Sequence, residues 1–378
     1  MLNILTIDLE DYFMVSAFEG VVKREDWDKY ESRIEHNTHR LLNILNGSFR
    51  NPQSAIRNPV RATFFCLGWV AERYPHLIRE IHQQGHEIGC HSYDHRLVYG
   101  MTPDEFREDI RKSKRLLEDA IGAEVIGYRA PSYSITKNSL WAFEVLIEEG
   151  FKYDSSIFPI RHDRYGIPNA PRFPFLISVN GNNTFEINTL NQILEVTPHS
   201  ALRIPHCLSP NPELRITNLA TIATADSINS INSTNPTNGT NSSILAGLTP
   251  NSELRTPNRL LEFPISTVRM LGQNIPISGG GYFRLFPYRM VKGGLRRICE
   301  SEGIPFVFYV HPWEIDPDQP RFRNCSRLSR FRHYVNLGKT ESRFRKLLND
   351  FHFSPIRDVA HLGCWMVTQA VSKNNQPK

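Results

Sequence analysis

The sequence contains little that would mark a disulfide-rich, membrane-spanning or nucleic-acid-binding protein. Six cysteines are spread over 378 residues without a CxxC pair or a regular spacing, which predicts buried free thiols. No apolar run reaches about 18 residues, the length that a membrane-spanning helix needs. The chain begins directly with a predicted strand, without the basic and apolar regions of a signal peptide. We therefore expect a cytoplasmic protein with no transmembrane span and no nucleic-acid partner.

Neither sign of charge is in large excess. Lys and Arg number 44 against 39 Asp and Glu, which gives a net charge of +5. The densest basic stretch runs from Arg321 to Lys346. It is either an ordinary solvated surface or a patch for an anionic glycan, lipid headgroups or a partner. Because 40% of the residues are hydrophobic, the chain is long enough to bury one large core.

Strands and helices alternate along most of the chain. Apolar runs rich in β-branched and aromatic residues predict strands at 3–8, 60–67, 87–90, 125–128 and 306–310. Helices are predicted from a cap at Ser32 to about 45, and between about 75 and 84, 103 and 121, and 139 and 149. Capping boxes that start at Ser32 and Thr102 are expected to open two of these helices. Because each strand ends in polar residues, the pattern predicts an α/β fold, a (β/α) barrel or a close variant.

One tract, from about 199 to 258, interrupts this alternation. It is rich in Asn, Ser, Thr and Pro and poor in aromatic residues, so it cannot bury much apolar surface. The string LSPNPELR at 208–215 returns as LTPNSELR at 248–255, which indicates a duplicated insertion. We expect the first part of the barrel at 1–198, a disordered low-complexity insertion at 199–258, the end of the barrel and an extension at 259–352, and a tail at 353–378.

Acidic and imidazole groups follow two of the predicted strands. Asp8 and Glu10 alternate by two, so they share a face of the first strand, whereas Asp11 points elsewhere or begins the loop. His91 and His95 can converge if the residues between them form a helical turn. Parallel α/β folds carry their chemistry at the carboxyl ends of the strands. Two His and one carboxylate would form a site for a divalent metal, and a second carboxylate would be free to act as a base.

Three more polar residues stand at predicted strand ends. Arg129 precedes Pro131 and is either a structural turn residue or a partner that holds a carboxylate bidentately. His311 ends an apolar strand, where it either packs or projects into the same rim as His91. Asp154 is in a position to orient His311 or Arg129.

Together these segments resemble the polysaccharide deacetylases of carbohydrate esterase family 4. The family's Thr-Phe-Asp-Asp-Gly motif has an altered counterpart in Thr6-Ile7-Asp8-Leu9-Glu10-Asp11. Its His-Ser/Thr-x-x-His, Arg-x-Pro and Leu-x-His-like motifs correspond to HSYDH at 91–95, Arg129-Ala130-Pro131 and Tyr309-Val310-His311. The strings LGWVAERYP, GGGYFR and FYVHPWEID are similar to a subgroup found beside exosortase and exopolysaccharide genes. That subgroup carries a C-terminal extension similar to residues 265–352.

The resemblance implies a distorted (β/α) barrel with a divalent metal, most often Zn²⁺. By position, His91 and His95 match the imidazole ligands. Glu10 or Asp11 matches the carboxylate ligand, and the shared face of the strand favours Glu10.

The resemblance also implies a division of roles. Asp8 matches the base that activates water, and Arg129 would orient it and keep it ionised. His311 would donate a proton to the departing amine. A backbone N–H near Ser132 would help to stabilise the oxyanion.

An N-acetylated glycan is the substrate that this family implies. The chain would remove acetyl groups from an amino-sugar polysaccharide or its precursor in exopolysaccharide biosynthesis, and it would associate with that machinery at the membrane. One alternative is a hydrolase of the same fold that acts on a small cyclic amide or ureide. The other is a glycan-binding relative without catalysis.

Overall fold

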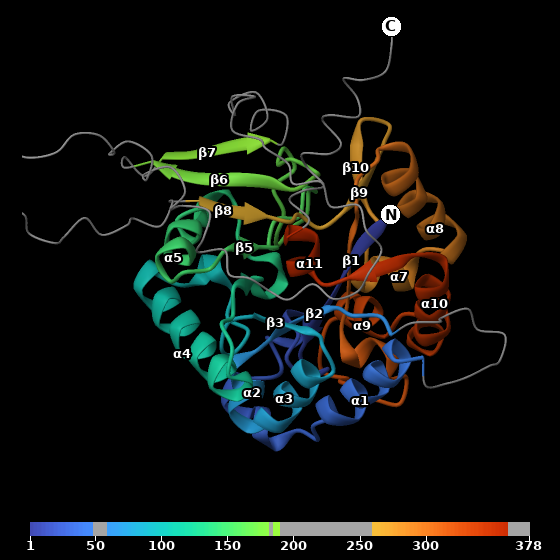
Figure 1. The fold of residues 1–378 in the computed structure, drawn as a ribbon. Coiled ribbons are helices and arrows are strands. Elements are labelled where there is room, and N and C mark those ends of the chain that lie inside the picture. The colour runs from blue at the N-terminus through green and yellow to red at the C-terminus, as the bar shows by residue number, and fades with distance from the viewer. Residues whose placement is uncertain (48–58, 181–183, 190–258, 362–378) are drawn as a thin grey trace, which may run out of the picture. The chain divides into compact units, whose positions relative to one another are not determined.

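The computed structural model describes residues 1–47, 59–180, 184–189 and 259–361 (Figure 1). The chain divides into a compact unit of Met1–Val196 with Pro257–Lys378 and a second unit, Thr197–Thr256. All the described residues belong to the first unit. The predicted insertion at 199–258 and most of the predicted tail at 353–378 lie outside the described residues.

A mostly parallel sheet forms the centre of the unit. Its parallel strands follow the order β11-β1-β2-β3-β4-β5-β8, so the first strand of the chain lies beside one of the last. The short β12 (His352–Ser354) also pairs with β1, and β6 (Phe175–Asn180) and β7 (Thr184–Thr189) add an antiparallel edge beside β8. The strands of the parallel run are β1 (Leu2–Leu9), β2 (Thr63–Cys66), β3 (Glu87–Cys90), β4 (Gly127–Tyr128), β5 (Tyr153–Asp154), β8 (Arg259–Glu262) and β11 (Val307–Val310).

Irregular segments join the two ends of this parallel run. The amide of Ile265 donates to the carbonyl of Ile157 at 2.9 Å, which continues the sheet past β8. On the far side, the amide of Val307 donates to Oγ of Ser266 at 2.8 Å, and the amide of Tyr309 donates to the carbonyl of Ser278 at 3.0 Å. The expected distorted (β/α) barrel is therefore confirmed, and its distortion lies where these segments replace regular strands.

The GGGYFR string has a structural reason at this closure. Gly279 has a φ of +139°, and a Cβ built on it would lie 2.1 Å from the carbonyl oxygen of Tyr309. No side chain fits there, because the backbone of residue 279 runs directly against β11.

Helices cover the outside of the sheet; α2, α3 and α4 lie beside β2 and β3 in Figure 1. The capping box at Thr102 is confirmed, with reciprocal hydrogen bonds between Thr102 and Glu105. The one at Ser32 is wrong: the helix begins after Arg33, and the Ser32 hydroxyl donates to Asp11 instead. The helices are α1 (Ile34–Leu45), α2 (Gly68–Arg73), α3 (Pro75–Gln83), α4 (Pro103–Ile121), α5 (Ala142–Glu148), α7 (Gly280–Leu285), α8 (Tyr288–Arg296), α9 (Arg327–Tyr334), α10 (Leu337–Asp350) and α11 (Ile356–His361).

Apolar side chains of the strands and of the inner helix faces make one extensive core. Seven of the eight residues of β1 are buried, as are all four residues of β2, β3 and β11. A hairpin of β9 (Thr267–Met270) and β10 (Gln273–Pro276) stands apart from the main sheet. Among the described residues, no helix is both long and apolar enough to cross a membrane.

Candidate active site at the carboxyl edge of the sheet

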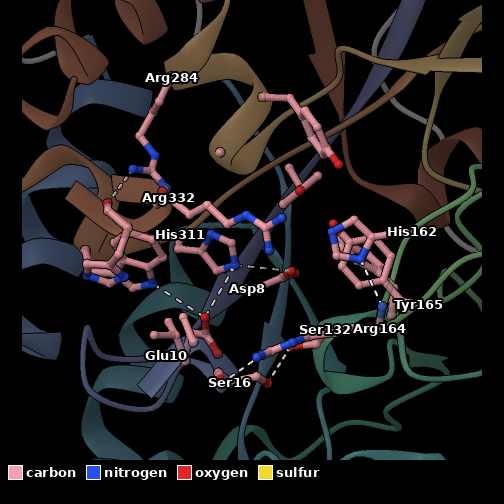
Figure 2. Close-up of a pocket in the computed structure, with 18 of the residues that line it drawn as sticks. Asp8, Glu10, Ser16, Ser132, His162, Arg164, Tyr165, Arg284, His311 and Arg332 are labelled. Carbon is pink, nitrogen blue, oxygen red and sulfur yellow. Dashed lines mark hydrogen bonds and ion pairs between the residues drawn. The ribbon is translucent and has the colours of Figure 1, made fainter. Parts of the chain in front are cut away.

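The predicted site residues from four separate strands meet at one edge of the sheet. Asp8 lies at the end of β1 with Glu10 just beyond it, His91 follows β3, Arg129 follows β4 and His311 follows β11. The parallel register brings these ends level, because Ile7 pairs with Val310 and Cys90 pairs with Tyr128. This arrangement explains why residues about 300 positions apart in sequence share one site (Figure 2).

Glu10, His91 and His95 form a buried cluster of possible metal ligands. One ligand atom from each residue lies within 4.8 Å of the others. The prediction that a helical turn brings the imidazoles together is wrong. Residues 91–95 form a loop in which Ser92 and His95 have positive φ values of 64° and 60°, and the two rings lie 5.6 Å apart between centroids.

The chemistry of this cluster fits a divalent cation. Nδ1 of His91 donates to the carbonyl of Arg129 at 2.7 Å, so its Nε2 carries the lone pair. Burial lowers the pKa of His91 to about 4, which keeps the ring neutral. Burial raises the pKa of Glu10, but the neighbouring His95, His311 and His91 outweigh that effect and lower it to about 2.

One oxygen of Glu10 lacks a fitting donor. Its Oε2 lies 2.8 Å from Nε2 of His95. Even so, no described group is aligned to donate a hydrogen bond to this buried atom. An ionised carboxylate beside two imidazoles is a donor set that suits Zn²⁺ and similar ions.

Asp8 and Arg129 form a buried ion pair next to the cluster. Nη1 of Arg129 donates to Oδ1 of Asp8 at 2.7 Å and to Oγ1 of Thr6 at 2.7 Å. The rest of the guanidinium donates to the carbonyl and hydroxyl of Ser155, at 3.0 and 2.8 Å. These bonds fix Arg129, which is fully buried, and leave Oδ2 of Asp8 on the side of His311.

His311 lies between two carboxylates of the site, Asp8 and Glu10, and a third carboxylate, that of Glu314. Its Nε2 lies 3.4 Å from Glu10 and 3.8 Å from Asp8, and its Nδ1 lies 3.1 Å from Oε2 of Glu314. Burial lowers the pKa of His311, but the hydrogen bond and charge of Glu314, followed by Glu10 and Asp8, raise it to about 9. The ring is therefore protonated at neutral pH.

Asp11, expected as the alternative metal ligand, and Asp154, expected as a supporting residue, make their hydrogen bonds outside the cluster. Asp11, the alternative ligand, turns away from the site and accepts hydrogen bonds from the amides of Arg33 and Tyr12, at 2.7 and 2.9 Å. Asp154 orients neither His311 nor Arg129. It accepts from the hydroxyl and amide of Ser156, at 2.6 and 3.1 Å, because that serine is two residues away on the same turn.

Ser132 lies at the edge of the site, as expected. It has a φ of +50°, and its hydroxyl lies 2.7 Å from that of Ser16.

Glu314 and Trp313 are functional candidates that our sequence reasoning missed. Trp313 stacks on His311, with 5.2 Å between ring centroids, and its Nε1 lies 3.4 Å from Glu10. The spacing of Glu314, three residues after His311 at the start of a 3₁₀ helix, was a usable capping signal.

The cluster lies in a pocket of about 440 Å³. Figure 2 shows Asp8, Glu10 and His311 at its centre, with Arg164, His162 and Tyr165 on one side and Arg332 on another. A second hollow, of about 550 Å³, shares Ser16, Ala17 and Arg164 with the first.

Two family models match the chain in separate regions. Residues 56–146 match the polysaccharide deacetylase model, and residues 230–361 match a domain of unknown function, DUF3473. These matches confirm the resemblance to the polysaccharide deacetylases of carbohydrate esterase family 4 and the presence of a C-terminal family domain. Residues 56–146 are therefore similar to polysaccharide deacetylases.

Curated relatives point to the same class. A peptidoglycan-N-acetylglucosamine deacetylase of Bacillus cereus is 38% identical over 86 residues, which is 22% of this chain and 31% of the relative. A peptidoglycan deacetylase of Helicobacter pylori is 33% identical over 25% of this chain and 32% of the relative. The chain thus spans about a third of the length of these relatives. A solved structure from Mycobacterium smegmatis assigned to the polysaccharide deacetylases aligns over 100% of this chain and 93% of that one, with 15% identity and a TM-score of 0.47.

Proposed function

We propose that the protein is a metal-dependent deacetylase that removes N-acetyl groups from an amino-sugar glycan. The observation that carries the proposal is the convergence of Glu10, His91 and His95 beside the Asp8–Arg129 pair and His311. The relatives named as peptidoglycan and chitin deacetylases support the same reaction class.

Glu10, His91 and His95 are the residues that would hold the metal, with Zn²⁺ as the favoured ion. When bound, such an ion supplies Lewis acidity toward the acetamide carbonyl and lowers the pKa of a coordinated water. The hydrogen bond from Nδ1 of His91 to the Arg129 carbonyl fixes the orientation of that ligand.

Asp8 is the proposed base. Arg129 donates to Oδ1, which leaves Oδ2 free to take a proton from the attacking water. The positive charge of Arg129 offsets part of the cost of burying the carboxylate of Asp8. Arg129 is itself fixed by Ser155 and Thr6, so it positions Asp8 and does not need to reach the substrate.

His311 is the proposed acid. It is protonated at neutral pH because Glu314 holds its other nitrogen, and it lies on the opposite side of Asp8 from Arg129. It can deliver a proton to the nitrogen of the departing amino sugar, so that the products are acetate and a free amine. The backbone amide near Ser132 is the proposed donor to the oxyanion.

The proposed biological setting is exopolysaccharide biosynthesis, where the protein would associate with the biosynthetic machinery at the membrane. The strings shared with the exosortase-associated subgroup support this setting. The cytoplasmic location expected from the sequence stays a prediction.

The pocket favours a glycan over the small cyclic amide that the rival hydrolase would take. Its lining includes Leu328 and Phe331, whose residues are 56% and 54% exposed, so it is open to solvent on that side. It also shares the lining residues Ser16, Ala17 and Arg164 with the second hollow. An enzyme for small cyclic amides would require a closed site around one compact substrate.

Acetate release tests the proposal directly. The full chain, freed of metal and then reconstituted with Zn²⁺, should release acetate from N-acetylated oligosaccharides in proportion to its bound metal. A parallel assay with cyclic amides and ureides separates the rival hydrolase. If the metal-loaded protein binds oligosaccharides but hydrolyses neither class, the non-catalytic alternative holds instead.

A further inference from the structure

We infer that the substrate carries anionic groups next to the N-acetylated sugar and that Arg164 and Arg332 bind them. This inference rests on the proposed deacetylase function and narrows its substrate class. The anionic group is a carboxylate, as in a uronic acid, or a phosphate ester; both offer the oxygen atoms that a guanidinium binds.

The charges around the pocket divide into two groups. The only acidic residues among its described lining are Asp8 and Glu10, at the centre, and the proposed reaction uses both. Three arginines line the pocket around them: Arg164, Arg284 and Arg332. The electrostatic character that a substrate meets outside the catalytic centre is therefore positive.

The guanidinium of Arg284 makes its hydrogen bonds within the protein. It is buried, its Nε donates to Glu314 at 2.7 Å, and the rest of its guanidinium donates to the carbonyls of Arg332, His333 and Val335. This arginine supports the wall of the site: four of its five N–H donors bind the protein and its side chain is buried.

Arg164 and Arg332 differ from Arg284 in this respect. Both are exposed, and within the described part of the chain neither has an acidic partner within 4.0 Å. Arg164 donates one hydrogen bond to the carbonyl of Ser16, at 3.2 Å, and the side chain of Arg332 makes none to a described residue. The acid nearest in sequence, Asp163, pairs with His162 at 2.9 Å.

The guanidinium groups of Arg164 and Arg332, which have no acidic partner among the described residues, approach the centre from different sides. Figure 2 shows Arg164 crossing below Asp8 toward Ser16, whereas Arg332 extends from the opposite wall near His311. Arg332 is also close enough to His162 to add to the effect of burial in lowering the pKa of that ring. A glycan with its acetamide at the cluster would therefore have a cation on each side.

The shape of the pocket agrees with a polymeric substrate. Arg164 lines both hollows, so a chain that leaves the catalytic pocket on that side passes it. On the other side, four residues of α9 line the pocket: Leu328, Phe331, Arg332 and the buried His333. The three exposed ones, Leu328, Phe331 and Arg332, follow an i, i+3, i+4 spacing. This i, i+3, i+4 spacing places one apolar and cationic face of the helix toward the substrate. Apolar side chains of this kind can pack on the C–H faces of sugar rings.

The position of Arg332 also decides between the two interpretations of the basic stretch from Arg321 to Lys346. Several arginines of that stretch face solvent or pair with acids, as Arg345 does with Glu341 at 2.7 Å. Arg332 alone among the basic residues of the stretch lines the catalytic pocket. The part of the stretch relevant to the substrate is thus one side chain on one helix face.

The test compares three N-acetylated oligosaccharides of matched length on the Zn²⁺-loaded full chain. One is neutral and contains only N-acetylglucosamine, one alternates N-acetylglucosamine with glucuronate, and one bears a 1-phosphate. We expect kcat/KM for at least one anionic substrate to exceed that for the neutral substrate by about tenfold at low salt. The ratio should shrink as salt rises, because exposed charges are screened. The better of the two anionic substrates identifies carboxylate or phosphate as the bound group.

Charge-neutral variants then locate the effect. Arg164→Gln and Arg332→Gln should each lower the anionic-to-neutral ratio by roughly three- to tenfold, mainly through KM, as expected for one charge-assisted contact. Arg330→Gln is the matched control, because Arg330 lies on the same helix, is exposed and does not line the pocket. It should leave the ratio unchanged.

Direct binding separates the failure of this inference from the failure of the proposed function. Calorimetric titration with the same oligosaccharides requires no turnover. Tighter binding of an anionic oligosaccharide that is lost in Arg332→Gln, without any acetate release, would uphold the inference and overturn the proposed activity. Equal binding and equal turnover of the neutral and anionic oligosaccharides, unaffected by either variant, would overturn the inference and leave the deacetylase proposal standing.

Discussion

The buried carboxyl pair of Asp154 and Glu262 predicts a specific pH dependence of stability. Glu262 accepts a hydrogen bond from the amide of Ile157 at 2.9 Å, and Ser156 donates to both oxygens of Asp154. Burial, followed by the charge of Asp154, raises the pKa of Glu262 well above its usual value. Burial also raises the pKa of Asp154, but hydrogen bonds with Glu262 and Ser156 oppose that effect, so we assign the proton of the pair to Glu262.

The sign of the effect follows from proton binding. Between the ordinary pKa of a glutamate, about 4.3, and the raised pKa of Glu262, the folded protein holds a proton that the unfolded chain has lost. The contribution of this group to the free energy of unfolding is complete below the ordinary pKa. It falls as pH rises toward the raised pKa, by at most about 1.4 kcal/mol per pH unit.

The perturbation is Glu262→Gln, which keeps the shape of the side chain and a donor toward Asp154 but cannot ionise. Relative to the wild type, the variant should gain up to about 1.4 kcal/mol of unfolding free energy for each pH unit above 5, until the raised pKa is passed. Urea unfolding at pH 5, 6, 7 and 8 measures this difference, and titrating groups that do not contact this pair cancel between the two proteins. Glu124→Gln, at an exposed position, is the control. A difference between variant and wild type that does not change with pH would refute the assignment of the proton to Glu262.

Three further predictions concern the site. His91→Ala and His95→Ala should each lose most of the bound metal and nearly all acetate release. Metal content is measured by elemental analysis, and a normal content in both variants would contradict the proposed set of ligands. His311→Gln should keep its metal while kcat falls by about 10²–10⁴-fold; the decline in rate as pH rises through about 9 should also disappear from its pH profile, because that limb reports the deprotonation of His311. Arg129→Met should lower the unfolding free energy by about 3–5 kcal/mol, measured in urea, because it leaves the buried carboxylate of Asp8 without its partner; a loss below about 1 kcal/mol would show that Asp8 is already solvated or protonated.

The strand ends were predictable from the sequence because their signals are local. Apolar runs followed at once by Asp8, His91, Arg129 and His311 indicated both the elements and the edge at which they meet. The choice of Glu10 over Asp11 also followed from local geometry, since residues that alternate by two share a face of a strand.

The features that the sequence did not reveal depend on unusual backbone angles or on distant partners. The spacing of His91 and His95 suits a helical turn, and nothing in HSYDH signals that Ser92 and His95 adopt positive φ values. Asp154 was expected to serve the site because its true neighbour, Glu262, lies 108 residues later, beyond the low-complexity tract. The contrast between Thr102 and Ser32 is similar, because a capping pattern does not show whether a third residue such as Asp11 competes for the hydroxyl.

The position of β1 between β2 and β11 affects how the protein is made. Ile4 pairs with Val307, so one edge of the first strand stays without its partner until about 300 more residues have left the ribosome. At about 5–20 residues per second, that delay lasts on the order of 15–60 seconds. During that time the unpaired apolar edge of β1 can pair with a strand of another chain, unless a chaperone or other residues of the same chain cover it.

The order of the strands also prevents the isolation of a working fragment. Residues 56–146, which match the deacetylase model, include His91, His95 and Arg129 but lack Asp8, Glu10 and His311.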